Sequence, residues 1–582
     1  MDFDPVPFDL LSGLGHWLLV LLAVATVGLF TALIVSLLAL GVRGPWFVLR
    51  QIGRGLVGFA GAFTPAGLQR VGAIAKLAIR EAIRRKALWI FAIFALLFMF
   101  AGWFLGSATT GTSEAAKPFI TFVLKVVQGL SLPLAVLLSC WGLPQDIKAR
   151  SLHTVVTKPV PRIEIVLGRM AGYAAVTTLV VAVMAVIGYV WIARTVPERA
   201  RSQLIGRVPV YGELGILDRE GKPGEGVNVG DIWDYRRYID GNSRARAIFT
   251  FDDLPVDELQ AGGPLPVEYD FEVFRTYKGD IETGVQAQFT LVNDRGTPEA
   301  DDDLELEFPD IPFEVKEFTD SVSEAVVEIP PRLIDREGYP VDLYRVATTS
   351  PPRTDAEGTP LDPDEAEPDG MLAPGQKLTI RVRCVDPEQY LGVARSDLFV
   401  RLPDRPFWLS YLKAMLGILL QTLVLVIIGT TASCIVKGPV ATFLVGGVMI
   451  LSIFGLREYA VEELLKRGET IADREAETIL GGGPIESVYR LVTQLNQTGN
   501  LPDTPGFKFM KETDKLLLGG ERLVVEVVPD FTAFETADYI TNGFDVPWSS
   551  ALLPAFATTL AFLIPCVFFG GLCLQMRELE AK

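Results

Sequence analysis

The chain has 582 residues, of which 49% are hydrophobic, and its mean hydropathy of +0.33 is higher than expected for a soluble protein of this size. Its formal net charge is −17, yet residues 201–400 hold 42 Asp and Glu against 20 Lys and Arg, so the remainder of the chain is net basic. A nucleic-acid-binding protein would instead concentrate basic residues on a water-soluble face. The composition therefore predicts membrane spans joined to an acidic soluble domain.

Cysteine and histidine are too few and too scattered for a metal site. Four cysteines lie in or beside apolar segments, namely Cys140, Cys434, Cys566 and Cys573, and Cys384 is alone in the acidic part. No disulfide framework or CxxC metal pattern follows from these positions. His16 and His153 are far apart in sequence. We therefore expect no metal and no cofactor on this chain.

Apolar runs predict the membrane spans. A helix needs about 20 mostly apolar residues to cross the hydrocarbon, where other open backbone structures are not tolerated. Seven runs meet this criterion, at residues 10–42, 87–106, 118–143, 170–193, 414–436, 439–456 and 547–575. The sequence thus predicts a polytopic α-helical membrane protein with about seven transmembrane helices. An odd number of spans places the two termini on opposite sides of the membrane.

The distribution of basic residues predicts the orientation of the chain. Residues 43–86 carry nine Lys and Arg but one acidic residue, Glu81. Because Lys and Arg are enriched in cytoplasmic loops, this segment is assigned to the cytoplasm. Alternation of the spans then places the N-terminus outside and the C-terminus in the cytoplasm.

This topology divides the chain into seven parts. They are the outer N-terminus and first span (1–42), a basic cytoplasmic amphipathic segment (43–86), spans two to four with a cytoplasmic loop at 144–169 (87–194), an acidic extracytoplasmic β-rich domain (195–405), spans five and six (406–456), a mainly helical extracytoplasmic segment (457–546), and the last span with a cytoplasmic tail (547–582).

Both extracytoplasmic segments have recognisable local patterns. In the first, alternating runs at 285–292, 323–329 and 377–385 are separated by Gly, Pro and Asp clusters, which predicts an antiparallel β-sandwich. Its Pro-rich and acidic stretch at 348–374 is predicted to be a mobile loop. In the second, apolar residues at helical spacing within 457–480 and 485–495 predict helices.

The stretch "AIAKLAIREAIRRKALWIF" (73–91) precedes the second span and is strongly basic. On a helix, Lys76, Arg80 and Arg84 lie on one side and small or aliphatic residues on the other. This pattern is typical of an amphipathic helix in the membrane interface. The alternative is a positively charged flank that only fixes the topology.

The stretch "QDIKARSLHTVVTKPVPRIEIVLGRMAG" (145–172) is a polar interruption between two spans. Pro159 and Pro161 must break a helix, since proline lacks the amide donor and disfavours helix in the residue before it. Residues 145–156 can form a short helix before that break, and 163–169 can restart one. A short cytoplasmic helix between two spans suggests a docking element for a soluble partner, whereas the alternative is a purely structural turn.

Four stretches together resemble a known family. They are 73–91, "ARSLHTVVTKPVPRIEIVLGRMAGY" (149–173), "ASCIVKGPVATFLVGG" (432–447) and "PDFTAFETADYITNGFDVPWSSAL" (529–552). In this order they resemble ABC-2 type transporter permeases related to the nitrous-oxide-reduction and gliding-motility exporters, and they cover roughly a six-span core. The chain departs from that family in an additional first span, in the large insertion between its fourth and fifth spans, and in Ser151, where glycine is frequent.

The resemblance implies a bacterial inner-membrane permease subunit beneath which a separate ABC ATPase docks, carrying ATP and Mg²⁺. A second permease subunit, identical or related, would complete the pathway. The resemblance assigns the coupling role to the loop, through Asp146, Lys148, Arg150, Ser151, Leu152, Thr154, Val155, Lys158, Pro159 and Arg162. Its charged residues would pair with the ATPase while Leu152 and Val155 fill a groove. The chain has no GxxxxGK[ST] sequence of its own, so we expect no catalytic residues and no enzymatic activity on it.

Two lysines lie within or beside predicted spans. Lys125 and Lys413 lie near the outer ends of their spans, where long side chains can reach water. The alternative is that they line a substrate pathway.

The alternative to the transporter function is a membrane-anchored extracytoplasmic binding or scaffold protein without transport activity. An intramembrane protease or transferase is disfavoured, because the sequence contains no HExxH or GxSxG motif.

Overall fold

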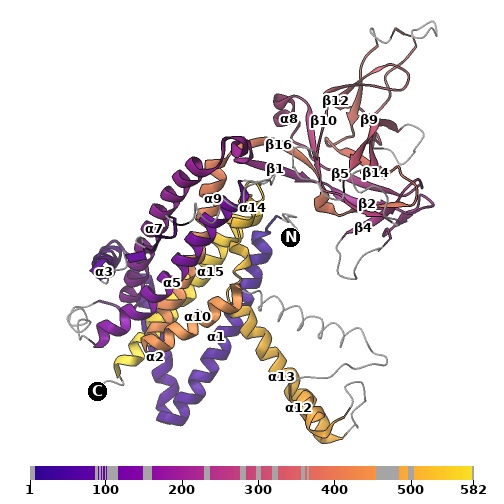
Figure 1. The fold of residues 1–582 in the computed structure, drawn as a ribbon. Coiled ribbons are helices and arrows are strands. Elements are labelled where there is room, and N and C mark those ends of the chain that lie inside the picture. The colour runs from indigo at the N-terminus through magenta and orange to yellow at the C-terminus, as the bar shows by residue number, and fades with distance from the viewer. Residues whose placement is uncertain are drawn as a thin grey trace.

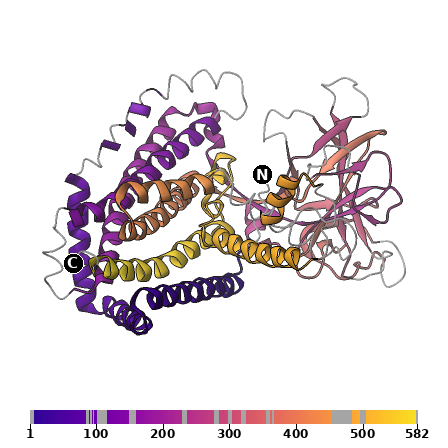
Figure 2. The same cartoon turned by 90° about the horizontal axis from the view of Figure 1, so that it is seen from below.

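A computed structural model describes residues 7–84, 89–90, 93–94, 96–98, 100, 116–148, 160–227, 236–275, 284–296, 303–316, 325–354, 361–362, 366–453, 484–495 and 504–579. The chain forms a bundle of long helices with a β-rich domain at one end (Figure 1). Seen from below, the helices of the bundle lie on one side of the view and the strands on the other (Figure 2).

Five helices are long and apolar enough to cross a membrane, by length and composition. They are α1 (Leu10–Leu40), α5 (Lys117–Lys148), α7 (Arg162–Thr195), α9 (Phe407–Ile435), and the π-helical turn η6 (Trp548–Leu552) continued by α15 (Leu553–Leu579). The predicted sixth span corresponds to the shorter α10 (Gly438–Ile453). The predicted second span falls largely outside the described residues. A membrane protein with a β-rich domain thus agrees with the structure, while the number of seven spans stays a prediction.

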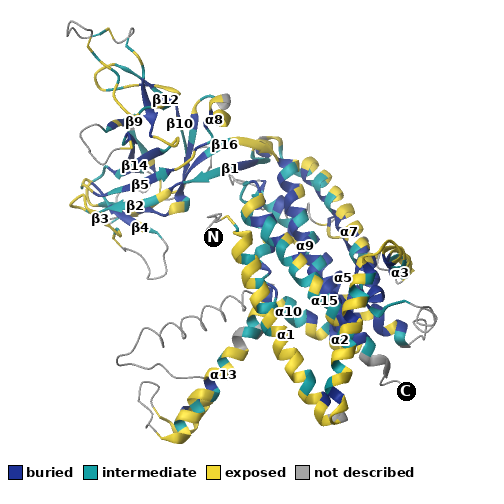
Figure 3. Ribbon diagram, turned by 180° about the vertical axis from the view of Figure 1, so that it is seen from behind, coloured by how far each residue is buried: buried dark blue, intermediate teal, exposed yellow. Residues whose placement is uncertain are grey.

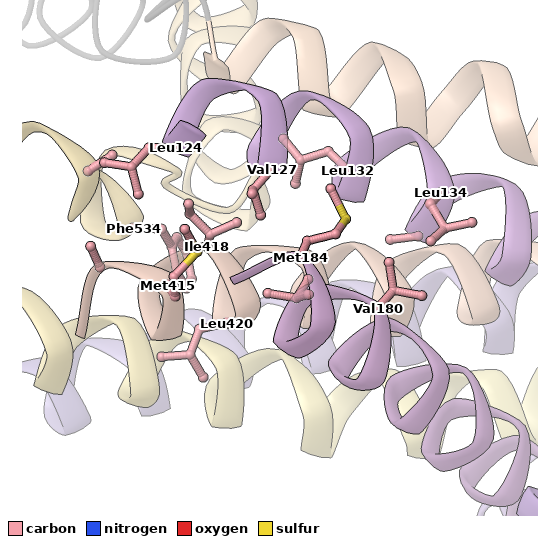
Figure 4. Close-up of a cluster of buried hydrophobic side chains, with 14 of the residues drawn as sticks. Leu124, Val127, Leu132, Leu134, Val180, Met184, Met415, Ile418, Leu420 and Phe534 are labelled. Atoms are coloured by element: carbon pink, nitrogen blue, oxygen red, sulfur yellow. The ribbon is translucent and has the colours of Figure 1, made fainter. Parts of the chain in front are cut away.

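The bundle core is formed by α5, α7 and α9. Leu124 and Val127 of α5, Met184 of α7, and Met415 and Ile418 of α9 meet in one buried cluster (Figure 4). Helix α9 carries apolar residues on all of its sides, as expected for a helix at the centre of a membrane bundle. In contrast, α1 is exposed along nearly its whole length (Figure 3). We therefore expect α1 to face lipid.

Small and polar residues allow α5 and α9 to approach closely. The Gln128 side-chain amide donates to the Gln421 side-chain oxygen at 2.9 Å, between the two helices. Further along, a Cβ on Gly429 would overlap the Ser139 hydroxyl. Close approach of backbones at small residues and side-chain hydrogen bonds between helices are the main sources of helix association in lipid.

The helices flanking the predicted loop are longer than their apolar runs. Residues 145–148, which could have begun a separate short helix, continue α5 through Pro144. Residues 163–169 are likewise the first turns of α7, which begins at Arg162 and runs for 34 residues. Neighbouring helices can satisfy the backbone groups that a proline leaves free, so Pro144 does not end α5.

The end of the bundle where α5 ends and α7 begins also carries α2 (Arg43–Ala62) and α3 (Pro65–Arg84), which are joined by a turn at Phe63 and Thr64. The other end carries a 3₁₀ turn η1 (Glu198–Gln203) after α7, and η5 (Thr532–Phe534) and α14 (Ala537–Thr541) before η6. The Phe8 amide donates to the Ser549 carbonyl at 3.3 Å, so α1 starts beside the start of α15. The first and last long helices therefore begin at the end nearest the β-rich domain.

Four sheets make up the β-rich domain. One sheet contains β1 (Ile205–Tyr211), β16 (Leu398–Pro406), β6 (Leu265–Tyr269) and β10 (Val326–Ile329), and the largest contains β3 (Pro223–Gly224), β2 (Glu213–Leu217), β5 (Arg246–Phe251), β14 (Leu378–Cys384), β8 (Val285–Asn293) and β9 (Leu304–Val315). The two three-stranded sheets are β11 (Arg332–Ile334), β12 (Pro340–Val346), β13 (Asp369–Leu372), and β4 (Arg237–Asp240), β15 (Gln389–Val393), β7 (Glu272–Arg275). A short helix α8 (Val256–Gly262) and a 3₁₀ turn η4 (Arg395–Asp397) complete the domain, whose sheets share one hydrophobic core.

The strands predicted at 285–292 and 377–385 are confirmed as β8 and β14, and β10 lies within 323–329. The predicted antiparallel pairing holds for the described strand pairs except β12 and β13, which run parallel. The prediction of a mobile loop at 348–374 is wrong for its last part, because Asp369–Leu372 form the buried strand β13. Asp369 of that strand accepts a hydrogen bond from Arg295 at 2.8 Å, so an acidic residue typical of loops is held inside the domain.

Asn293 at the end of β8 organises this part of the domain. Its side-chain amide donates to the carbonyls of Ala347, Gly370 and Leu372, at 3.0, 2.8 and 3.2 Å. Replacing Asn293 with alanine should leave these three carbonyls, two of them buried, without that donor and lower the free energy of unfolding by about 2 kcal/mol. Thermal unfolding of the detergent-purified chain checks this, with Gln260→Ala on the exposed side of α8 as the control. Equal unfolding midpoints of the two variants would contradict it.

The segment at 457–546, for which an extracytoplasmic position stays a prediction, contains α12 (Pro484–Thr493) and α13 (Pro505–Val527). The helix predicted at 485–495 is confirmed as α12. The helix predicted at 457–480 lies outside the described residues.

Candidate functional site

The candidate site is a cluster of charged side chains at the end of the bundle opposite the β-rich domain. Arg169, in the second turn of α7, donates from Nη1 to Glu81 Oε2 of α3 at 2.6 Å and pairs through Nη2 with Asp146 of α5. Arg169 and Asp146 are both buried. One guanidinium therefore joins the three helices that surround the predicted loop.

A second ion pair fixes α3 to the first turn of α7. Arg70 donates from Nε and Nη2 to the two carboxylate oxygens of Glu164, both at 2.6 Å. This bidentate geometry is the strong form of an Arg–carboxylate pair. Glu164 is fully buried, and its hydrogen bond raises the pKa of Arg70. Because a buried carboxylate without a cation is costly, this pair specifies where α3 lies along α7.

Two glycines of α7 allow α3 to pack closely against it. A Cβ on Gly168 would lie 2.7 Å from the Cβ of Ile74, and a Cβ on Gly172 would lie 2.5 Å from the Cβ of Ala78. The spacing Gly-x-x-x-Gly is typical of close helix contacts in membranes. The apolar side of α3 therefore faces α7.

The remaining contacts place the start of α7 between α2 and α15. A Cβ on Gly58 of α2 would lie 3.6 Å from Pro161 Cβ, and a Cβ on Gly571 of α15 would overlap Ile163. On the α5 side, a Cβ on Gly142 would overlap the Tyr173 hydroxyl. Pro161 and Ile163, at the start of α7, are thus packed against α2 and α15. A force on the loop that precedes them would therefore act on α2 and α15 as well as on α7.

The structure places the predicted coupling residues as follows. Asp146 is buried and paired with Arg169 of α7, a contact that the sequence did not predict. Its pairing with a soluble partner stays a prediction. Arg162 is partly exposed at the start of α7, and Lys148 is in the last turn of α5. Arg150, Ser151, Leu152, Thr154, Val155, Lys158 and Pro159 lie outside the described residues.

The basic side of α3 is where the amphipathic pattern predicts it. Lys76, Arg80 and Arg84 are exposed, and Ala78 and Ala82 are buried. The apolar side that the membrane-interface interpretation assigned to lipid is covered at Ile74 and Ala78 by α7. An interface helix and a topological flank stay the two alternative predictions for these charges.

Sequence reasoning missed the residues that hold the cluster together. Arg70 was included only among the basic residues of 43–86, and Arg169 and Glu164 were given no role, although each is paired across helices. A usable signal was available in "LGRMAGY" (167–173), where an arginine stands between two glycines four residues apart at the start of an apolar run.

Lys413 has a different environment from the one expected. Its ammonium donates to Asp545 Oδ2 at 2.6 Å and to the Val546 carbonyl at 3.0 Å, and Ser410 donates to the other Asp545 oxygen at 2.6 Å. Only 4% of Lys413 is exposed, so the expectation that its side chain reaches water is wrong. Lys125, in contrast, is exposed on α5. A pathway role for either lysine stays a prediction.

Removing the Lys413 ammonium should destabilise the chain. Lys413→Met leaves Asp545 buried beside Ser410 and the more distant Arg405, which lies 3.7 Å away, so we expect a loss of about 2 kcal/mol of unfolding free energy. Adding Asp545→Asn should recover part of this loss, since the buried charge is then removed. Denaturant unfolding in detergent measures both variants, with Lys125→Met as the matched control. A double variant less stable than Lys413→Met would contradict the ion-pair account.

The β-rich domain is joined to the bundle next to this ion pair. The backbone of Arg207 in β1 donates to the Gly543 carbonyl at 2.9 Å and accepts from the Asp545 amide at 2.8 Å. Its guanidinium pairs with Glu268 of β6 and lies 4.3 Å from the centre of the Phe544 ring. Burial lowers the pKa of Arg207 and raises that of Glu268. In addition, β16 ends at Pro406 and α9 begins at the next residue, so no linker separates strand from helix.

Buried ion pairs lie at both ends of the bundle, so the bundle is suited to transmitting movement from one end to the other.

In the part of the chain that the structure describes, no group of three or more His, Cys, Asp or Glu side chains is placed to hold a metal ion. Comparisons with protein-family models, with curated proteins and with solved structures gave no match. The family resemblance therefore rests on the four stretches of sequence quoted above.

Proposed function

We propose that this chain is the membrane-spanning permease subunit of an ATP-driven ABC-type exporter, with ATP hydrolysis on a separate polypeptide. The observation that supports it most is the Arg169 cluster. It joins α5 and α7, which flank the predicted coupling loop, to α3. An ATPase that docks on the loop would therefore move these helix ends as one unit.

In this proposal α7 relays the movement to the β-rich domain. It is one helix of 34 residues, which corresponds to about 51 Å at 1.5 Å per residue. Its start is fixed by Arg169 and Glu164, and its end leads through η1 into β1, where Arg207 contacts the 542–545 segment. ATP binding by the partner would shift the bundle between two conformations, each favoured by one nucleotide state.

The loop itself would divide its roles between apolar and charged residues. Leu152 and Val155 would fill a groove of the ATPase and supply most of the affinity. Lys148, Arg150 and Arg162 would act at the rim, where charges mainly set orientation and association rate. Asp146, whose carboxylate is paired with Arg169, would contribute less to the contact with the ATPase than these residues.

The remaining partners follow from the same proposal. A second permease subunit would complete the pathway across a bacterial inner membrane, with the N-terminus outside and the C-terminus in the cytoplasm. ATP and Mg²⁺ would bind the ATPase. The β-rich domain would shape the exit or dock an extracytoplasmic partner.

Affinity purification of the full-length chain from its own membrane in mild detergent tests the proposal. We expect a Walker-type ATPase without membrane spans at a stoichiometric level, and at least a tenfold loss of it with Leu152→Asp. The matched control is Ile334→Asp, an exposed aliphatic position in β11 of the β-rich domain. If no ATPase accompanies the wild-type chain, the proposal fails and the extracytoplasmic scaffold function takes its place.

A further inference from the structure

The hairpin formed by α12 and α13 has charged residues at its helix contact. Glu486 and Arg490 of α12 are 2% and 5% exposed, and Arg490 donates from Nη2 and Nε to Glu486 Oε1 at 2.7 and 2.9 Å. Asp514 of α13 accepts from the amides of Ile485 and Glu486 at 2.8 and 2.9 Å, so a carboxylate of one helix caps the N-terminus of the other. The charged groups of Glu486, Arg490 and Asp514 therefore find hydrogen-bond partners inside the hairpin.

Its large apolar side chains point outward. On α12, Leu491 is 81% exposed, and on α13, Leu516 is 77% exposed. The full set of exposed apolar positions is Ile485, Val488, Leu491, Val492 and Leu495 on or just after α12, and Phe509, Leu516, Leu517 and Val527 on α13. The α12 positions recur at helical spacing and form one face. Figure 3 shows α13 with an extensive exposed surface.

This distribution of polarity is the reverse of that in a water-soluble hairpin. In water, the two apolar faces would pack against each other and the charges would face solvent. In lipid, polar groups must find partners within the protein, and apolar side chains can face outward without loss. An exposed apolar surface of this extent marks an interaction site.

Two further observations indicate what covers that surface. The end of α13 lies beside α1, where His16 Nε2 and Glu526 Oε2 are 3.0 Å apart, and the adjoining Trp17 donates to the Ala561 carbonyl of α15 at 3.2 Å. The end of α13, where Val527 is exposed, thus adjoins α1, which we expect to contact lipid. Moreover, Lys508, Lys511 and Lys515 are exposed along one side of α13.

We propose that α12 and α13 form a hairpin embedded in the membrane interface, with their apolar faces among the acyl chains. The lysine row of α13 lies at the level of the headgroups and contacts anionic lipid. A row of lysines flanking an apolar face is typical of interfacial helices. The partner of this surface is the lipid bilayer, and the hairpin is an anchor rather than part of a water-exposed domain.

Spin-label accessibility in nanodiscs tests the proposal on the full-length chain. Nitroxide labels are placed at Leu516→Cys and Leu491→Cys, with Leu18→Cys on α1 as the lipid reference and Ile334→Cys in the β-rich domain as the water reference. The signal from native cysteines is subtracted with the labelled wild-type chain. We expect collision with oxygen to exceed collision with a water-soluble nickel complex at 516 and 491, as at 18. Water-like accessibility at 516 and 491, or spin–spin broadening that shows a second copy of the chain at this surface, would overturn the proposal.

The composition of the nanodisc tests the lysine row separately. Phosphatidylcholine nanodiscs are compared with nanodiscs that also contain phosphatidylglycerol. We expect the label at 516 to lie deeper with the anionic lipid, and this shift to disappear when Lys508, Lys511 and Lys515 are all replaced by glutamine. The same depth in both lipids would overturn the headgroup contact.

Discussion

Replacing Arg169 with methionine is expected to lower the free energy of unfolding by about 3–5 kcal/mol, the range typical of breaking a buried ion pair. The guanidinium pairs with Glu81 and Asp146 from two other helices. Without it, both carboxylates lose the cation that they share, in a region of low dielectric constant. Denaturant unfolding of the purified chain in detergent measures the change.

Two further variants separate this effect from a general loss of charge. Arg80→Met removes an exposed arginine from the same α3 and should unfold like the wild type. Combining Arg169→Met with Glu81→Gln and Asp146→Asn should recover most of the stability, because the two negative charges that Arg169 neutralises are then absent as well. If Arg169→Met unfolds like the wild-type chain, the cluster does not hold the helices together.

Replacing Gly172 with leucine is expected to separate α3 from α7. A Cβ at this position lies 2.5 Å from Ala78 Cβ and 2.8 Å from the Ala75 carbonyl, so both helices would have to move apart. Overpacking of this kind costs about 3 kcal/mol at the upper end of its usual range, and the cost rises where separation also weakens Arg70–Glu164. Hydrogen exchange should become faster across the α3 backbone.

The matched control for this variant is Gly129→Leu. A Cβ on Gly129 meets nothing within 4 Å, so the same substitution in α5 should leave hydrogen exchange and unfolding unchanged. Protection of α3 that is equal in the two variants would contradict the close contact between α3 and α7.

Hydropathy predicted the positions of the long helices but not where they end. The apolar runs at 118–143 and 170–193 are contained in α5 and α7, which extend further toward the loop. The additional turns contain Asp146, Glu164 and Arg169, and charged residues of this kind in a sequence predict exposure to water. They remain helical and buried because each charge meets a partner from another helix. That pairing depends on tertiary contacts, which local composition does not contain.

The same limit explains the errors at Lys413 and at β13. A lysine near the end of a span normally extends to water, but Asp545 reaches Lys413 from a position 132 residues away. A stretch rich in proline and acidic residues normally forms a loop, but Arg295 and Asn293 hold its last residues in a sheet. Alternation within a strand is a local property, and β8 and β14 were therefore predictable.

The α12–α13 hairpin shows a further limit of sequence patterns. Helical spacing at 485–495 predicted a helix, and α12 confirmed it. The spacing identifies an apolar face but does not say whether that face meets protein, water or lipid. The buried pair of Glu486 and Arg490, which only the structure shows, is one of the observations from which we infer lipid contact.

The most direct measurement of the proposed function is ATP hydrolysis by the purified complex of this chain with its co-purifying ATPase in nanodiscs. The account predicts ATP turnover with the wild-type chain, and at least a tenfold lower turnover with Leu152→Asp at an unchanged yield of folded protein. Ile334→Asp should hydrolyse ATP like the wild type. Full ATP turnover with Leu152→Asp, or none with the wild-type chain, would contradict the account.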